Sequence, residues 1–189
     1  MIRHMSRKLS ACRPYLLAFA IFVLALTQAH AQCDPHAANP PSPPAQAAVT
    51  LGGKSVTIDY CAPSMRGRKI FGELLPYDHW WRTGANTSTT LKTETDLRIG
   101  TLKVPAGSYS IYSIPSATTW KLIINKQTGQ WGTKYDEKQD LGRTDMQKGP
   151  PPSSPVETFQ IKFENTSGAK TELHLVWENT DVYVPVEAQ

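Results

Sequence analysis

TFQIKFENTSGAKTELHLVWENTDVYVPV, residues 158–186, is the stretch that decides the class of fold. Apolar residues occupy every second position in three of its runs, which are Phe159 to Phe163, Leu173 to Trp177 and Val182 to Val186. Alternation with a period of two is typical of strands with one buried face. The turns between the runs are short and polar, so successive strands are expected to pair in antiparallel fashion.

Six further short segments upstream have the composition of strands, because β-branched and aromatic residues dominate them. They are residues 55–60, 91–95, 97–99, 102–104, 109–114 and 120–125. Since the sequence has no long amphipathic helix, about nine short strands predict an all-β protein, either an antiparallel β-sandwich or a partly closed barrel. At most one short helix is expected, around Lys69 to Leu75, and residues 133–155 are expected to form a long surface loop.

The first 31 residues have the organisation of a secretory signal peptide. Four basic residues between positions 3 and 13 precede an apolar run at positions 15–26, and the small-residue pattern Ala29-His30-Ala31 follows. The apolar run is shorter than the roughly 20 residues that a membrane-spanning helix needs, so a retained anchor is only the alternative. A lipoprotein is disfavoured because Gln32, which is not a small residue, precedes Cys33. We expect cleavage after Ala31 and an exported product, periplasmic or extracellular, without a membrane span.

Cleavage would also change the charge of the protein. The whole chain has 20 basic and 16 acidic residues, and four of the basic residues but none of the acidic ones lie in the first 31 positions. The remaining chain would carry 16 of each and be formally neutral. The basic isoelectric point of the whole sequence is therefore no argument for nucleic acid or an anionic membrane as a partner.

Residues 32–48 are rich in Pro and Ala, a composition that buries little surface, so a disordered tail is expected there. A single β domain should then occupy residues 49–189, a length suited to one core. Loss of Cys12 with the signal peptide would leave Cys33 and Cys61 in an oxidising compartment. The sequence leaves open whether these two cysteines are bridged, and such a disulfide would tether the tail to the first strand.

The segment from Pro63 to Asn86 stands apart from the alternating strands. It concentrates arginine, histidine and tryptophan among Gly and Pro residues that interrupt regular structure. Loops displayed by a rigid scaffold are disproportionately the sites of binding and catalysis. This segment is therefore the candidate site.

A series of short motifs begins in this segment and continues to the end of the chain. The motifs are Tyr60, Pro63-Ser64, Gly67-Arg68, Ile70-Phe71-Gly72, Leu75-Pro76-Tyr77, Trp81-Arg82-Thr83-Gly84-Ala85-Asn86, Val104-Pro105-Ala106-Gly107-Ser108-Tyr109-Ser110, Ile114-Pro115, Trp120, Ile124-Asn125-Lys126, Gln130-Trp131-Gly132 and Trp177-Glu178-Asn179-Thr180. The series resembles the signature of an uncharacterised bacterial family, domain of unknown function 2911. The resemblance implies a secreted or envelope protein and carries no established reaction or catalytic residue. In the family's pattern an acidic residue commonly follows Gly-Ala-Asn, whereas this chain has Thr87, so a role for that carboxylate does not carry over.

Arg66, Arg68, Arg82 and Asn86 are the candidate ligand-binding residues of the segment. A guanidinium binds a carboxylate, sulfate or phosphate group through two parallel hydrogen bonds. The competing structural interpretation is that the arginines pair with nearby acids and fasten the loop to the sheet. Those acids are Asp59, Glu73 and Asp78.

Five tryptophans could pack in the core or cover an apolar face of a ligand. Trp120 and Trp177 fit inward strand positions, whereas Trp80 and Trp131 lie near interrupting residues and are the better surface candidates.

His79 beside Asp78 forms a weak candidate for a general base with an orienting carboxylate. The two could cooperate only in a turn, because adjacent residues of a strand point to opposite faces, and no Gly-x-Ser-x-Gly elbow accompanies them. The histidines and cysteines lack the close paired spacing of zinc ligands, so no metal or other cofactor is expected. His174 is expected to lie exposed on the outer face of its strand.

The leading hypothesis is a secreted, non-enzymatic β-sandwich that binds a small molecule, glycan or envelope component through the loop from Arg66 to Asn86. One alternative is an extracytoplasmic hydrolase that uses His79 with Asp78 or Glu73. Another is a structural or assembly protein of the cell envelope, which predicts an exposed apolar patch or sheet edge instead of a pocket.

Overall fold

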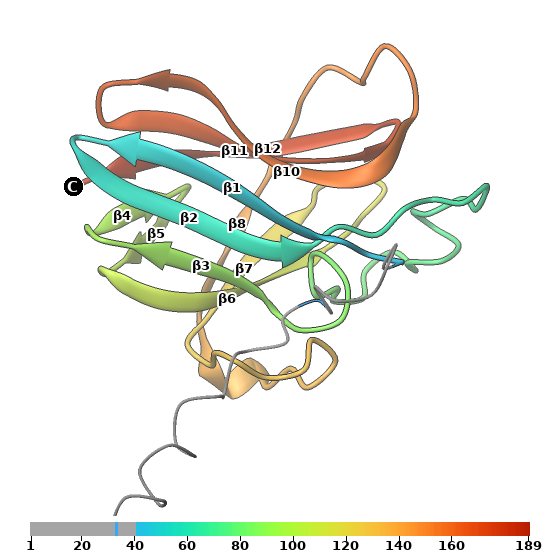
Figure 1. Ribbon diagram of the computed structural model, residues 1–189, viewed down its shortest axis with the longest axis horizontal. Helices are drawn as coiled ribbons and strands as arrows, with labels where there is room; N and C mark the ends of the chain where they lie inside the picture. The colour runs from blue at the N-terminus through green and yellow to red at the C-terminus, as the bar shows by residue number, and fades with distance from the viewer. Residues whose placement is uncertain (1–32, 34–40) are drawn as a thin grey trace, which may run out of the picture. The chain divides into compact units, whose positions relative to one another are not determined.

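A computed structural model describes Cys33 and residues 41–189. In this part of the chain, twelve strands form two antiparallel sheets that do not close into a barrel (Figure 1). The first sheet has the order β1 (Pro44–Leu51), β2 (Lys54–Cys61), β3 (Thr89–Thr93), β6 (Gly107–Ile114), β7 (Lys121–Asn125) and β8 (Asp140–Asp145). The second has the order β10 (Val156–Ser167), β11 (Lys170–Glu178), β12 (Thr180–Ala188), β4 (Leu97–Ile99) and β5 (Leu102–Val104), and β9 (Gln147–Lys148) also pairs with β12. The prediction of an all-β, sandwich-like fold is confirmed.

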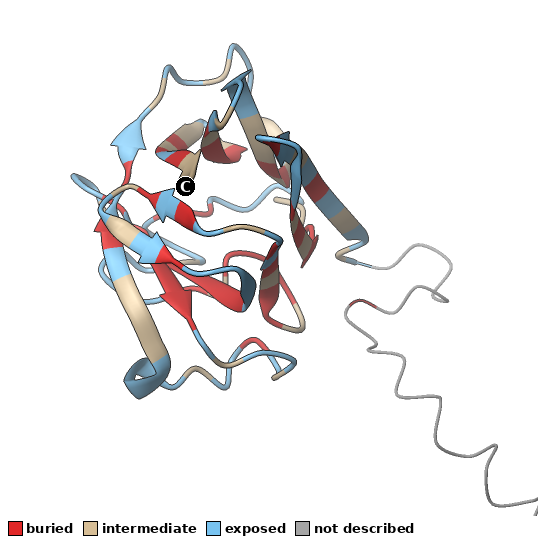
Figure 2. Ribbon diagram, turned by 90° about the vertical axis from the view of Figure 1, so that its left-hand side faces the viewer, coloured by how far each residue is buried: buried red, intermediate tan, exposed pale blue. Residues whose placement is uncertain are grey.

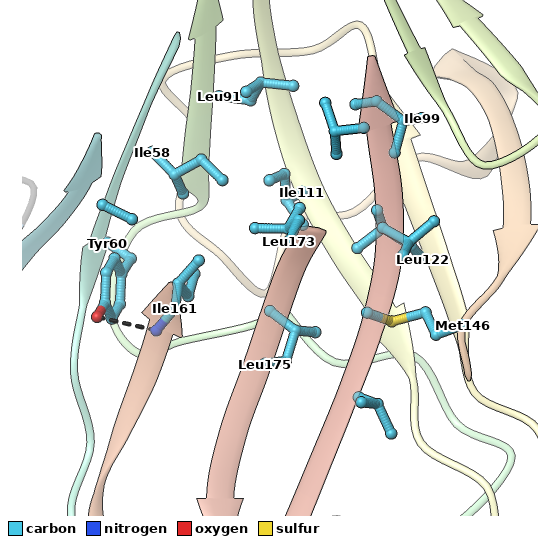
Figure 3. Close-up of a cluster of buried hydrophobic side chains, with 14 of the residues drawn as sticks. Ile58, Tyr60, Leu91, Ile99, Ile111, Leu122, Met146, Ile161, Leu173 and Leu175 are labelled. Carbon is cyan, nitrogen blue, oxygen red and sulfur yellow. Dashed lines mark hydrogen bonds between the residues drawn. The ribbon is translucent and has the colours of Figure 1, made fainter. Parts of the chain in front are cut away.

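The core lies between the two sheets. Leu91 and Ile111 from the first sheet meet Leu173 and Leu175 from the second, as Figure 3 shows, and each is at most 2% exposed. In strands such as β2, β3 and β12 buried positions alternate with partly or fully exposed ones, whereas β6, β7 and β11 contain runs of four or five buried residues (Figure 2). Alternation of apolar and polar residues therefore places one face of each sheet in a common core.

A side-chain contact also joins the two sheets. The buried Tyr60 side chain of β2 accepts a hydrogen bond from the backbone N–H of Ile161 in β10 at 3.0 Å (Figure 3). Its ring packs edge-on against Phe159 at a centroid distance of 5.7 Å. The tyrosine thus satisfies a backbone donor that would otherwise be buried without a partner.

Three expectations about secondary structure need correction. Residues 44–48, expected in the disordered tail, belong to β1, an edge strand whose alanines and glutamine give little hydrophobic signal. Residues 133–155, expected to be a loop, contain β8, β9 and a short 3-10 turn at Glu137–Gln139. Residues 69–75 form turns with a bridge between Phe71 and Leu75 instead of a helix. The strands β1, β8 and β9 account for the difference between the expected number of about nine strands and the observed twelve.

His174 is buried, which corrects the prediction of an exposed histidine. Its Nδ1 lies 2.8 Å from Asp181 Oδ1, and its ring stacks on Tyr183 at a centroid distance of 5.0 Å. β11 lies between β10 and β12, so neighbouring side chains on β12 cover its outer face.

Cys33 and Cys61 form a disulfide, which settles the alternative that the sequence left open. The sulfur atoms are buried beside Ala85 of the candidate loop. The expected signal peptide and residues 34–40 of the expected tail lie outside the described residues. Within the described part of the chain, no helix has the length and apolar character needed to cross a membrane.

Candidate functional site

The loop between β2 and β3 contains backbone that side chains seldom adopt. Arg66, Asp78, Thr83 and Asn86 all have positive φ, with values of 50°, 62°, 52° and 58°. Thr83 is the most unusual of them because β-branched residues rarely occupy this region. Strained backbone of this kind persists where the surroundings fix it, and it concentrates at functional sites.

Buried hydrogen bonds hold Thr83 in place. Its Oγ1 lies 2.9 Å from Ser113 Oγ, and its carbonyl oxygen accepts a bond from the Thr89 hydroxyl at 2.7 Å. Trp81, two residues earlier in the chain, exchanges two backbone hydrogen bonds with Ser113 of β6, at 2.7 and 2.9 Å. The conformation of the segment from Trp81 to Asn86 is therefore set by the sheet beneath it.

A cluster of five aromatic rings anchors the rest of the loop to the core. We call it the aromatic wall, and it consists of Phe71, Trp81, Trp120, Phe159 and Trp177. Phe71 packs on Trp120 at 4.8 Å, and Trp81 stacks on Trp177 at 5.7 Å between ring centroids. Trp177 was expected in the core, and it is 2% exposed.

A cleft of about 470 Å³ opens beside this wall, and we call it the arginine cleft. Four of the six candidate ligand-binding residues line it: Arg66, Arg68, Arg82 and Asn86. Trp81, Trp177, Leu74 and Leu75 supply apolar surface. Among the described residues that line the cleft there is no Asp or Glu. Three other surface hollows are smaller, at about 340, 300 and 260 Å³.

Arg66 and Arg68 are partly engaged by backbone carbonyls. Arg66 Nη2 donates to the Pro41 carbonyl oxygen at 3.1 Å. Arg68 donates from Nε to the carbonyl of Met65 at 2.9 Å and from Nη2 to that of Ser64 at 2.8 Å. Both arginines therefore shape the loop, and each retains nitrogen atoms that are not used in these bonds.

Arg82 differs from the other two arginines. Within the described residues its side chain forms no hydrogen bond, and its Nε is fully buried without a partner. Burial lowers the pKa of the guanidinium, and the nearby Tyr112 only partly opposes this effect. A buried donor without a partner is costly, so a group that accepts from Arg82 would be bound favourably.

Of the three acids proposed as partners for the arginines, two pair elsewhere, and the Asp78 side chain forms no ion pair within the described residues. Asp59 bonds to Gln46 and Lys92, and Glu73 forms an ion pair with Lys69. Across the described residues, none of the three arginines forms an ion pair with an acid. The structural interpretation thus fits the backbone bonds of Arg66 and Arg68 but not the predicted acids.

Asn86 lies at the end of the strained segment. Its carbonyl oxygen accepts a hydrogen bond from the Gly132 N–H at 3.0 Å, while its side-chain amide forms no hydrogen bond within the described residues. The fixed backbone with a free amide suits a residue that orients a ligand.

Trp80 and Trp131 are exposed, at 42% and 50%, but neither lines the arginine cleft. Trp80 packs against Tyr112 and Tyr135, with ring centroids 5.9 and 5.0 Å away. The apolar surface of the cleft comes from Trp81 and Trp177 instead. Sequence reasoning missed these residues because buried tryptophans are usually counted as core, although the edge of a core ring can also form a pocket wall.

His79 is not brought to a catalytic partner. Both His79 and Asp78 are exposed, and their side chains form no hydrogen bond or ion pair within the described residues. The same part of the chain contains no group of three or more His, Cys, Asp or Glu side chains arranged to hold a metal ion. The hydrolase alternative therefore gains no supporting contact.

Comparison with known proteins identifies the family of this chain but indicates no activity. Neither the curated proteins nor the solved structures include a match to this chain. A family model described as a protein of unknown function (DUF2911) matches residues 42–186, which include both sheets and almost all of the arginine cleft. The match spans more than half of the chain, and the protein therefore belongs to the DUF2911 family.

Proposed function

We propose that the protein binds a small organic anion in the arginine cleft. The observation that carries this proposal is Arg82, a residue that lines the cleft and whose side chain, with its Nε buried, has no hydrogen-bond partner in the described residues. A carboxylate, sulfate or phosphate group would supply the missing acceptor.

The charges around the cleft support an anion. Three arginines and no acid of the described chain line it, so these residues make the local potential positive although the chain without its first 31 residues is formally neutral. Low-dielectric walls strengthen the attraction between a guanidinium and an anion. The free amide of Asn86 would add a directional contact.

The apolar walls support an organic ligand rather than an inorganic ion. Trp81 and Trp177 lie on one side, and Leu74 and Leu75 contribute further apolar surface. The volume of about 470 Å³ falls within the range of about 300–1,000 Å³ that is typical of small-molecule sites. An anionic head group near Arg82 with an apolar body along the tryptophans would use both kinds of surface.

Binding is favoured over catalysis by the lining residues themselves. Within the described part of the chain, they include no His, Asp, Glu or Cys that could act as a general base or a strong nucleophile. We further infer an exported protein, periplasmic or extracellular, because residues 1–31 have the pattern of a signal peptide and disulfides persist in oxidising compartments.

A binding screen with Arg82→Gln tests the proposal. Sulfate, phosphate and a panel of aliphatic and aromatic carboxylates would be titrated while the tryptophan fluorescence is recorded, because Trp81 and Trp177 line the cleft. Calorimetry would then give the affinity of each anion that responds. We expect binding by the wild type and a loss of at least about tenfold in Arg82→Gln, equivalent to about 1.4 kcal/mol.

Arg98→Gln is the matched control, because Arg98 lies outside the arginine cleft and pairs with Glu187. It should bind as the wild type does. If no anion binds the wild type, or if Arg98→Gln and Arg82→Gln weaken binding equally, the proposal is wrong.

A further inference from the structure

A second hollow, of about 260 Å³, is lined by other members of the aromatic wall, and we call it the tyrosine hollow. Phe71 and Trp120 of the wall line it, whereas Trp81 and Trp177 line the arginine cleft. Tyr77 adds a further ring to the hollow. The same aromatic cluster therefore forms surface in two separate places.

Tyr77 presents an exposed ring in a fixed position. It is 39% exposed, yet its ring lies against Gly72, where a Cβ would stand 2.9 Å from Tyr77 Cε2. Gly72 also has a φ of +86°, a conformation that favours glycine, and a side chain at this position would displace the Tyr77 ring. Its N–H donates to the Leu75 carbonyl at 2.9 Å, which closes the turn beneath the ring. The ring is thus held at the edge of the hollow instead of packing into the core.

Asp181 supplies an oriented carboxylate to the same hollow. Its Oδ1 bonds to Nδ1 of the buried His174 at 2.8 Å, and the other ring nitrogen of His174 lies 3.4 Å from Glu172 Oε2. The histidine ring is also stacked on Tyr183. Asp181 Oδ2 forms no hydrogen bond within the described residues, so one fixed acceptor remains for a ligand.

The remaining polar groups balance the charge of the hollow. Lys148 lines it and is held in place by a bond from Nζ to the Ala117 carbonyl at 2.9 Å. Asp181 and Lys148 are the acid and the base among the lining residues, in contrast to the three arginines of the other site. Asn179, in the exposed turn between β11 and β12, adds an amide without a side-chain bond in the described residues. This combination favours a neutral ligand with several hydroxyl groups.

We propose that the tyrosine hollow binds a single neutral sugar ring. The C–H face of a pyranose is apolar and packs on the face of an aromatic ring, which Tyr77 provides. Its hydroxyl groups both donate and accept, so they can bond to Asp181 Oδ2, the Asn179 amide and the Lys148 ammonium. The volume lies just below the range of about 300–1,000 Å³ for small-molecule sites, which limits the ligand to about one ring.

Saturation-transfer NMR with four sugars tests this proposal. Glucose, galactose, mannose and N-acetylglucosamine would be added separately, at millimolar concentration, to the wild type and to three variants. We expect transfer from at least one sugar, its loss in Tyr77→Ala and Asp181→Asn, and about tenfold weaker binding in Asn179→Ala. Asn179 is exposed and in a turn, so its variant keeps the test decisive even if either of the others fails to fold.

Two control variants establish whether the sugar lies in the tyrosine hollow. Trp131→Ala removes an exposed aromatic residue outside the hollow, and Arg82→Gln alters only the arginine cleft, so both should retain the sugar signal. Transfer from none of the four sugars, or transfer that survives in folded Tyr77→Ala, overturns the proposal. A signal that is lost in Arg82→Gln but kept in Asn179→Ala also overturns it, since the sugar would then lie in the arginine cleft.

Discussion

Gly132 lies directly against the side chain of Arg82: a Cβ at Gly132 would stand 2.3 Å from Arg82 Cδ. It would also stand 2.7 Å from the carbonyl oxygen of Asn86. The backbone of Gly132 is bonded to that same carbonyl through its N–H. A glycine far along the chain from the loop therefore sets where two residues of the arginine cleft can lie.

Gly132→Ala should destabilise the protein and displace Arg82. The new methyl group meets backbone as well as side chain, so it cannot be accommodated by a rotamer change alone, and overpacking of this kind costs about 1–3 kcal/mol. Urea denaturation would measure the change in the free energy of unfolding. Gly142→Ala is the control, because its Cβ would meet only the flexible end of Leu102. Equal stability of the two variants would contradict the close contact.

Removal of the charge at Arg82 and at Arg68 should have different effects on the free energy of unfolding. Arg82→Met removes a half-buried guanidinium that has no hydrogen bond within the described residues, so the free energy of unfolding should stay constant or rise by up to about 1 kcal/mol. Arg68→Met loses two bonds to backbone carbonyls and should lower it by about 1–2 kcal/mol. Thermal and urea unfolding of both variants provide the measurement. A loss of several kcal/mol in Arg82→Met would mean that Arg82 is a structural residue.

The strands with a strong alternating pattern could be predicted from the sequence, and the weak edge strands could not. In β2 the buried residues are Val56, Ile58 and Tyr60, as the alternation indicates, together with Cys61 at its end. β1 and β8 lie at the two edges of the first sheet and contain small or polar residues. Their pairing depends on backbone hydrogen bonds to a neighbouring strand, and those bonds leave little trace in the side-chain pattern.

The candidate site could likewise be predicted from the sequence only in part. Composition was enough to place Arg66, Arg68, Arg82 and Asn86 in one segment, and the structure brings all four to one cleft. It was not enough to distinguish the arginines bonded to carbonyls from the unpaired Arg82. Every residue has a backbone carbonyl, so the residue types do not show which carbonyl accepts a hydrogen bond. The prediction of an exposed His174 was wrong for a related reason, because the burial of this side chain depends on residues of β12.

Tyr60→Phe should destabilise the fold and change its response to alkaline pH. Without the hydroxyl group the buried N–H of Ile161 loses its acceptor, which costs about 1–3 kcal/mol at neutral pH. Burial raises the pKa of Tyr60, and the bond from Ile161 offsets this only in part. Above about pH 10 the unfolded chain releases the phenol proton while the folded protein retains it, so stability falls as the pH rises.

The variant lacks this phenol, so its stability should fall less steeply between about pH 9 and about pH 11 than that of the wild type. Urea titrations across this range give both slopes. Tyr183→Phe serves as a control at neutral pH, because it removes only an exposed bond to Gln147. Parallel slopes for Tyr60→Phe and the wild type would show that Tyr60 does not contribute to the alkaline loss.

Reduction of the Cys33–Cys61 disulfide should lower the free energy of unfolding and weaken anion binding in the arginine cleft. The bridge joins residues 28 apart in sequence, and in the chain-entropy model a loop of that size contributes about 3–4 kcal/mol. The Cys61 carbonyl accepts a bond from the Ala85 N–H at 3.1 Å, and both Ala85 and Pro41 line the cleft. Loss of the bridge therefore removes a constraint on two of its walls.

Urea unfolding with and without a reducing agent should show the loss of stability in the wild type. Cys33→Ala should start from the lower stability and should not respond to the reducing agent. Equal stability of oxidised and reduced wild type would contradict the prediction, and an unchanged anion affinity after reduction would show that the walls keep their positions without the bridge.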